Sequence, residues 1–242
     1  MLLTRRVVAE LVGTALLLVA VVGSGIAAQR LSPGDTGLQL LENAIATAAA
    51  LAAIILAVGA VSGAHLNPVV TLADRFFGGL TTREAGAYIG AQVAGAVLGT
   101  IIANLMFELP AIEFAQRTRS GSGLWLGEVV ATFGLLLVIF GLARAGRLTL
   151  APFAVAGWIA GAYFATSSTS FANPAVTIGR SLTDTFTGID PSSVPAFVVF
   201  QVVGAALAVV VVRVLYPTVA NVAADVIVPH PANEQETHHE HS

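Results

Sequence analysis

Apolar residues gather in six long stretches of the chain, and shorter, more polar segments separate them. A helix that crosses a bilayer needs about 20 mostly apolar residues, because each residue adds about 1.5 Å. The stretches cover residues 7–28, 38–61, 84–107, 123–144, 149–169 and 194–216. We therefore predict an all-α membrane protein with six transmembrane helices, a single domain over residues 1–216 and a polar tail over residues 217–242.

Two further segments, residues 62–78 and 167–187, are apolar but too short to cross a bilayer. Each contains Asn-Pro followed by helix-compatible residues, a pattern typical of a helix that starts with a polar cap and a proline in its first turn. Membranes tolerate backbone outside a full-length helix only where it is buried in protein or lines a water-filled cavity. These segments therefore predict two re-entrant half-helices that border a pore.

Three short motifs occur twice, in the same order. ELVGT at Glu10 returns as EVVAT at Glu128, NPVVT at Asn67 as NPAVT at Asn173, and QVAGA at Gln92 as QVVGA at Gln201. The chain thus consists of two repeats, residues 5–107 and 123–216, with three spans each. Because three is odd, the second repeat inserts upside down relative to the first. The half-helices then enter from opposite faces, and their N-termini, which are positive dipole ends, meet near the midplane.

Composition and charge narrow the function classes. Hydrophobic residues make up 56% of the chain and charged residues only 10%, whereas soluble domains carry roughly 25% charged residues. The net charge of −3 and the lack of a basic patch argue against a nucleic-acid partner. The sequence has no cysteine and no catalytic constellation, so we expect neither an enzyme, a cofactor nor a metal site. More arginines lie on the side of the membrane that carries the two chain termini than on the other side. This excess predicts that both termini lie in the cytoplasm.

The twin Glu-x-x-x-Thr, Asn-Pro and Gln-x-x-Gly-Ala motifs resemble the aquaporin, or major intrinsic protein, family. The resemblance implies the aquaporin fold in the plasma membrane or a bacterial inner membrane. It also implies one pore per subunit and a homotetramer in the lipid bilayer that passes water or small neutral solutes passively.

The paired asparagines predict the chemistry of the pore. A solute in a narrow apolar tube loses its hydrogen bonds to water, so the wall must replace them. Asn67 and Asn173 would supply amide donors at the midplane, and the carbonyls of residues 63–66 and 169–172 would supply acceptors. The positive half-helix ends would repel cations. The alternative is that each asparagine only caps its own helix.

Several polar residues within the spans require partners. Glu10 and Glu128 would be costly in the membrane if isolated. They either form a proton relay or ion site, or accept hydrogen bonds from the backbone of a half-helix and hold it in place. Gln92 and Gln201 either lie along the pore or brace the half-helices. His65 either gates the pore by protonation or makes a structural contact.

The family resemblance also implies a constriction at four positions, which fall here on Thr47, Gly161, Ser170 and Val176. The family usually has an arginine at the last position, whereas this chain has valine. We therefore expect a wide, uncharged constriction that admits glycerol-class molecules. The run TSFANPAVTIGR resembles channels associated with bacterial arsenic resistance, which implies passage of neutral arsenite.

Arg180 lies four residues after Val176, on the same helix face. It either carries the missing charge into the outer vestibule or forms an ordinary ion pair with Asp184. In the tail, His238, His239 and His241 either bind a metal or belong to a solvated segment. A water-selective aquaporin, an inverted-repeat secondary transporter and a structural membrane-junction protein are the alternative functions.

Overall fold

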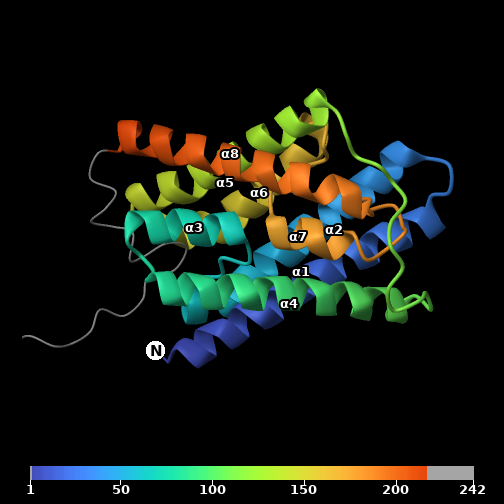
Figure 1. Ribbon diagram of the computed structural model, residues 1–242, viewed down its shortest axis with the longest axis horizontal. Helices are drawn as coiled ribbons and strands as arrows, with labels where there is room; N and C mark the ends of the chain where they lie inside the picture. The colour runs from blue at the N-terminus through green and yellow to red at the C-terminus, as the bar shows by residue number, and fades with distance from the viewer. Residues whose placement is uncertain (1, 217–242) are drawn as a thin grey trace, which may run out of the picture.

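The structure is a computed structural model that describes residues 2–216, which fold into one helical bundle (Figure 1). Six helices in this part of the chain are long and apolar enough to cross a membrane. They are α1 (Leu3–Leu31), α2 (Thr36–Ser62), α4 (Thr82–Met106), α5 (Ser122–Arg144), α6 (Ala151–Ala165, preceded by the 3-10 turn η1, Leu148–Leu150) and α8 (Val194–Leu215, preceded by the 3-10 turn η2, Pro191–Ser193). The predicted all-α fold with six spans is confirmed. The tail over residues 217–242 lies outside the described residues.

Two short helices, α3 (Pro68–Phe77) and α7 (Pro174–Arg180), occupy the predicted half-helix positions. Each begins with a proline directly after an asparagine cap. Figure 1 shows them in the middle of the bundle, one following the other along its long axis. α6 ends at Ala165, four residues before the predicted limit, and α7 is short. The second repeat therefore contains more non-helical chain than the sequence predicts.

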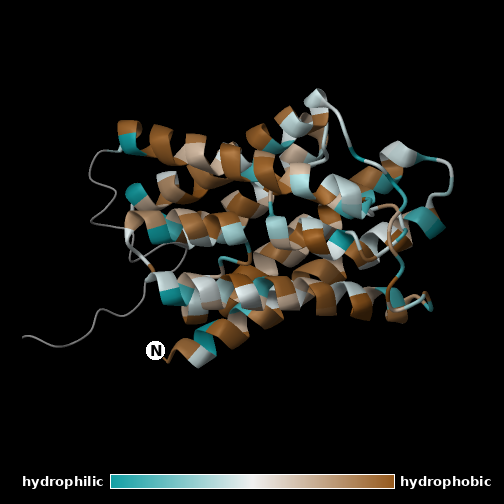
Figure 2. Ribbon diagram, in the orientation of Figure 1, coloured by the Kyte–Doolittle hydropathy of each residue, from teal (hydrophilic) through white to brown (hydrophobic). Residues whose placement is uncertain are grey.

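Helix packing follows the repeats. α1 packs against α2 and α4, α5 packs against α6 and α8, and α2 meets α6 between the repeats. A side chain at Gly95 or Gly99 would collide with the backbone of α1, so small residues are needed where α1 and α4 cross. Apolar residues dominate the helices, and polar residues concentrate at the ends of the bundle (Figure 2).

The two ends of the bundle differ in the segments they carry (Figure 1). We call the end with the start of α1 and the end of α8 the terminal end. We call the opposite end, which carries the connection between α4 and α5, the loop end. The half-helix α3 runs toward the terminal end, and α7 runs toward the loop end.

Candidate functional site

Asn67 and Asn173 join the two half-helices. In each asparagine, Oδ1 accepts a hydrogen bond at 3.0 Å from the backbone N–H two residues further on, which caps the helix. The side-chain nitrogens reach across the repeats: Asn67 donates to the carbonyl of Ala172, and Asn173 donates to the carbonyl of Leu66, both at 2.8 Å. Each asparagine thus caps its own helix and also bonds the other repeat. An amide carries two hydrogens, and the bond across the repeats uses one of them in each asparagine.

The backbone before each asparagine has the same unusual conformation in both repeats. Ala64 and Leu66 have φ values of 48° and 52°, and Ser170 and Ala172 have φ values of 52° and 48°. These are the third and first residues before each asparagine. Residues other than glycine rarely adopt this left-handed region, which costs of order 1–3 kcal/mol each. Surrounding contacts must therefore hold both segments in place.

Glu10 and Glu128 provide these contacts. Both are fully buried. Glu10 accepts the backbone N–H groups of His65 and Leu66 at 2.9 and 2.7 Å, and Glu128 accepts those of Phe171 and Ala172, both at 2.9 Å. This is the geometry that the bracing alternative requires.

Gln92 and Gln201 complete the same arrangement in both repeats. Gln92 donates to Glu10 at 2.7 Å and to a threonine of α3 at 2.9 Å. Gln201 donates to Glu128 at 2.6 Å and to a threonine of α7 at 2.8 Å. None of these four residues is among the described residues that line the central cavity. Their position beside the half-helices, away from the cavity wall, fits bracing and does not fit an ion pathway.

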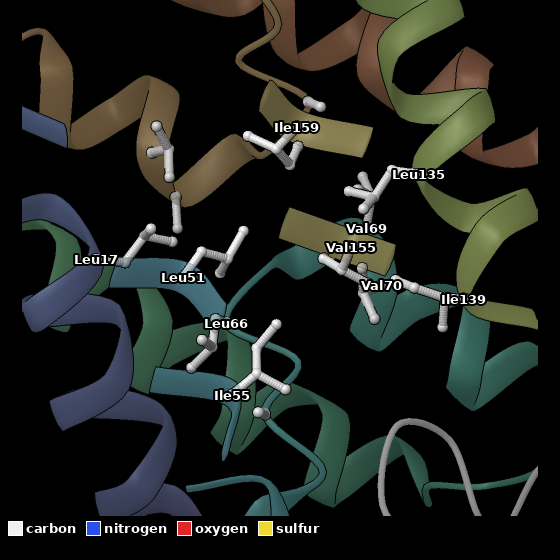
Figure 3. Packing of buried hydrophobic residues seen from close by; sticks show 14 of the residues in the cluster. Leu17, Leu51, Ile55, Leu66, Val69, Val70, Leu135, Ile139, Val155 and Ile159 are labelled. Atoms are coloured by element: carbon white, nitrogen blue, oxygen red, sulfur yellow. The ribbon is translucent and has the colours of Figure 1, made fainter. Parts of the chain in front are cut away.

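The cavity between the half-helices has a mainly apolar wall. Figure 3 shows aliphatic side chains that converge on the middle of the bundle from several helices. Those that line the cavity include Leu17, Leu51, Ile55, Leu135, Ile139, Val155 and Ile159. Asn67, Asn173 and His65 contribute polar atoms to the same cavity. The wall of the cavity therefore combines many aliphatic side chains with a smaller number of polar ones.

Three of the four residues expected at the constriction line this cavity: Thr47, Ser170 and Val176. Gly161 does not, because it is exposed on the outer face of α6. The register predicted for Gly161 is therefore wrong. On α6 the cavity-facing positions recur every four residues. These positions are Val155, Ile159 and Tyr163.

Aromatic rings also border the cavity. Tyr163 lines it, and its hydroxyl donates to Oγ1 of Thr47 at 3.3 Å. Phe171 lines it as well, and its ring packs edge-on against Phe197. Sequence spacing missed both rings because one depended on the register of α6 and the other on the irregular backbone before Asn173.

Arg180 lies in the cavity wall toward the loop end and is only 3% exposed. Its guanidinium carbon lies 3.4 Å from the centroid of the Phe171 ring, and its Nε donates to the carbonyl of Thr187. Within residues 2–216, Arg180 forms no ion pair with Asp184, whose carboxylate instead accepts the backbone N–H of Gln116. The ion-pair alternative is therefore wrong, and the guanidinium contributes a charge to the cavity wall.

His65 lines the cavity on the other side of the asparagines. Its Nδ1 lies 3.1 Å from Oγ1 of Thr71, and its Nε2 lies 3.9 Å from a carboxylate oxygen of Asp74. Its ring contacts Tyr88 edge-on at 5.3 Å between centroids. Asp74 was missed in the sequence, although the repeat offset contained the signal: it is the seventh residue after Asn67, as Arg180 is the seventh after Asn173.

Metal-ligating side chains do not converge in the described part of the chain. No group of three or more His, Cys, Asp or Glu residues in it is placed to hold a metal ion. The three histidines of the tail, at positions 238, 239 and 241, lie outside the described residues.

Comparison with known proteins agrees with this geometry. The family model "Major intrinsic protein" matches residues 1–161. The aquaglyceroporin AqpS of Rhizobium meliloti is 48% identical over 211 residues, which cover 87% of this chain and 90% of AqpS. The aquaporin AqpM of Methanothermobacter marburgensis is 34% identical over 236 residues, which cover 85% of this chain and 95% of AqpM.

A solved structure shows the same fold. The X-ray structure of the aquaglyceroporin from Plasmodium falciparum superposes with a TM-score of 0.68 and covers 90% of this chain and 99% of its own. It is 23% identical in sequence, so it supports the fold alone. From the family model and these relatives together, the chain belongs to the major intrinsic protein family of membrane channels, which are not enzymes.

Proposed function

We propose that the chain is a passive channel for water, glycerol-class polyols and neutral metalloid acids such as arsenite. The observation that carries this proposal is the apolar cavity in which Asn67 and Asn173 meet, with Val176 in its wall where the family usually has an arginine. The 48% identity to a protein named an aquaglyceroporin supports a solute range wider than water.

Conduction follows from the chemistry of the wall. A neutral solute that leaves water loses hydrogen bonds worth several kcal/mol each if they are not replaced. The asparagine amides replace them at the centre, and the hydroxyls of Thr47 and Ser170 add donors and acceptors nearer the loop end. The aliphatic wall offers no polar contact, so a solute is held at few points and leaves easily. An ion would need far more compensation, and the positive half-helix ends repel cations.

Solute size is set, in this proposal, by the wall around Val176. Arg180 lies one helical turn further along α7, which places its backbone about 6 Å nearer the loop end. The stacking of its guanidinium on Phe171 holds the charge against the wall. The guanidinium can then repel cations and donate to solute oxygens in the outer vestibule without narrowing the passage at Val176.

The assembly belongs to the same proposal. We propose a homotetramer in the plasma membrane or a bacterial inner membrane, with the terminal end in the cytoplasm. Large apolar side chains are exposed along the outside of the bundle, as lipid or neighbouring subunits require. Examples are Leu16, Leu56, Leu98 and Val210.

Stopped-flow light scattering on proteoliposomes tests the proposed function. We expect the permeability to water, glycerol and arsenite to exceed that of empty liposomes, and glycerol flux to rise linearly with its gradient. Water permeability alone would favour the water-selective alternative. Saturable flux driven by an ion gradient would instead support a transporter.

A further inference from the structure

Two buried arginines at the loop end share one aromatic ring. The guanidinium carbons of Arg180 and Arg119 lie 3.4 and 5.0 Å from the ring centroid of Phe171. Arg180 is 3% exposed and Arg119 is 7% exposed. Arg119 comes from the connection between α4 and α5, whereas Arg180 ends α7. Two segments far apart in sequence therefore bring two positive charges to one place.

Neighbouring backbone carbonyls hold both guanidinium groups in the same way. Nε of Arg119 donates to the carbonyl of Gly188 at 3.0 Å, and Nε of Arg180 donates to the carbonyl of Thr187. In the part of the chain that the structure describes, the terminal Nη nitrogens of both arginines have no hydrogen-bond acceptor. Both guanidinium groups are thus fixed through Nε, while their Nη donors remain unused.

No carboxylate among residues 2–216 forms an ion pair with either arginine. The acidic groups nearby have other partners. Glu128 accepts backbone N–H groups of the second half-helix segment, Asp184 accepts that of Gln116, and Asp190 accepts that of Ser192. The pair therefore carries a positive charge that the protein does not neutralise by direct contact.

This arrangement is electrostatically unfavourable without an anion. Burial, and after it the positive charges of Arg180 and Arg117, lower the pKa of Arg119 from its ordinary value. A desolvated guanidinium that lacks a counter-ion costs free energy. An anion bound by the Nη nitrogens of these arginines would lower this cost, and planar guanidinium groups bind tetrahedral oxyanions through two parallel hydrogen bonds.

We propose that Arg119 and Arg180 form a binding site for a small tetrahedral oxyanion such as inorganic phosphate, which obstructs the loop end of the pore while it is bound. Arg180 lines the cavity, so an anion on its Nη nitrogens occupies the path of a solute. The binding step stands on the arginine geometry alone. The obstruction step rests on the proposed function.

Binding is tested on the purified chain by thermal unfolding at constant ionic strength, with chloride replaced stepwise by inorganic phosphate. The wild type should gain stability saturably, by about 3 °C at ten times the dissociation constant. Arg119→Gln should lose this gain. Arg117→Gln is the matched control, because Arg117 belongs to the same connection but is exposed, and it should keep the gain.

Three results would overturn the site: no phosphate effect in the wild type, an equal effect in Arg119→Gln, or loss of the effect in Arg117→Gln, which would indicate general charge screening. If Arg119→Gln does not fold, Arg119→Lys replaces it. Lysine keeps the charge without the planar fork, so phosphate should bind it at least several-fold more weakly, and unchanged binding would contradict the proposal.

Obstruction is tested by glycerol flux into proteoliposomes that contain phosphate on both sides. Phosphate should lower wild-type flux at least twofold and leave Arg119→Gln unaffected, with its basal flux equal to that of the wild type. If phosphate stabilises the protein but does not slow glycerol, the obstruction step is wrong. Absence of any wild-type glycerol flux would contradict the proposed function, while the unfolding experiment would still decide whether the site exists.

Discussion

The two segments that contain the half-helices have the same backbone conformation before the asparagine. They differ in one charged side chain, which is acidic in the first segment and basic in the second. Both have left-handed residues at the third and first positions before the asparagine, a glutamate that accepts two backbone N–H groups, and a glutamine that joins this glutamate to a threonine. At the seventh residue after the asparagine they diverge. α3 has Asp74 there and α7 has Arg180, and both are 3% exposed.

The difference between Asp74 and Arg180 separates the parts of the site that must be the same in both repeats from the parts that need not be. The central hydrogen bonds need both repeats, so the same residues appear twice. The ends of the passage face different compartments and have diverged. Toward the terminal end, His65 lies near Asp74, and toward the loop end, Arg180 stacks on Phe171. Substitution of either central asparagine should therefore have the same effect on flux, whereas substitutions at the two ends should have different effects.

The largest effect should come from the asparagines. Asn67→Leu and Asn173→Leu each remove a central donor and leave a buried carbonyl of the other repeat unpaired, which costs about 1–3 kcal/mol. We expect glycerol flux to fall to the empty-liposome level in both variants. Stopped-flow scattering measures the flux, and size-exclusion chromatography verifies that the protein is folded. Wild-type flux in either variant would mean that solutes do not pass the asparagines.

Next in size should be the effect on stability of the buried glutamates. Glu10 accepts four hydrogen bonds, from Ser62, His65, Leu66 and Gln92, and Glu128 accepts three, from Phe171, Ala172 and Gln201.

Each bond to a charged acceptor contributes about 1.5–3 kcal/mol, so Glu10→Gln should lower the unfolding temperature more than Glu128→Gln. The comparison of the two variants by thermal unfolding in one detergent measures this. A larger loss for Glu128→Gln would show that the repeats are not braced by these bonds alone.

A selective effect should follow from Val176→Arg. The added guanidinium narrows the passage and binds solutes, so glycerol and arsenite permeation should fall by about tenfold, a rise of 1.4 kcal/mol in the barrier, while water permeation falls less. Val176→Leu adds volume without charge and separates the two causes. An equal fall for all three solutes would place the constriction elsewhere in the cavity.

The smallest effect on solute flux should come from Arg180→Leu. Removal of the charge should raise the leak of cations or protons, measured with a pH-sensitive dye under an imposed potential, and leave glycerol flux nearly unchanged. Asp184→Asn should change neither, because Asp184 does not contact Arg180 through an ion pair. A leak at the wild-type level in Arg180→Leu would assign cation exclusion to the half-helix dipoles alone.

Most of the fold could be predicted from the sequence because the bilayer imposes a strict length on apolar helices. The Asn-Pro pairs also identified the start of both half-helices. They could do so because helix capping depends only on residues that are close in sequence. Tyr163 was missed at the cavity wall, and Gly161 was placed there wrongly. The family resemblance gives no information on the local register of α6, and the segment between α6 and α7 is irregular.

The charges at the loop end could not be predicted for a different reason. Arg119 lies in a connection between two spans, where arginine is ordinarily solvated. Its burial depends on backbone hydrogen bonds between this connection and the segment after α7, such as those from Ala115 to Ser181 and from Asp190 to Arg117. Such pairing of two irregular segments has no periodic signal. Phe171 likewise became a platform for guanidinium groups only because Glu128 holds its backbone.

The crossed bonds of Asn67 and Asn173 also constrain how the chain assembles. Each asparagine donates to a carbonyl of the other repeat, so neither repeat can satisfy its own half-helix segment before the other has entered the membrane. During synthesis the first repeat emerges alone, and the carbonyl of Leu66 must wait for a partner more than a hundred residues away. The hydrogen bonds at the centre therefore form only when both repeats are in place.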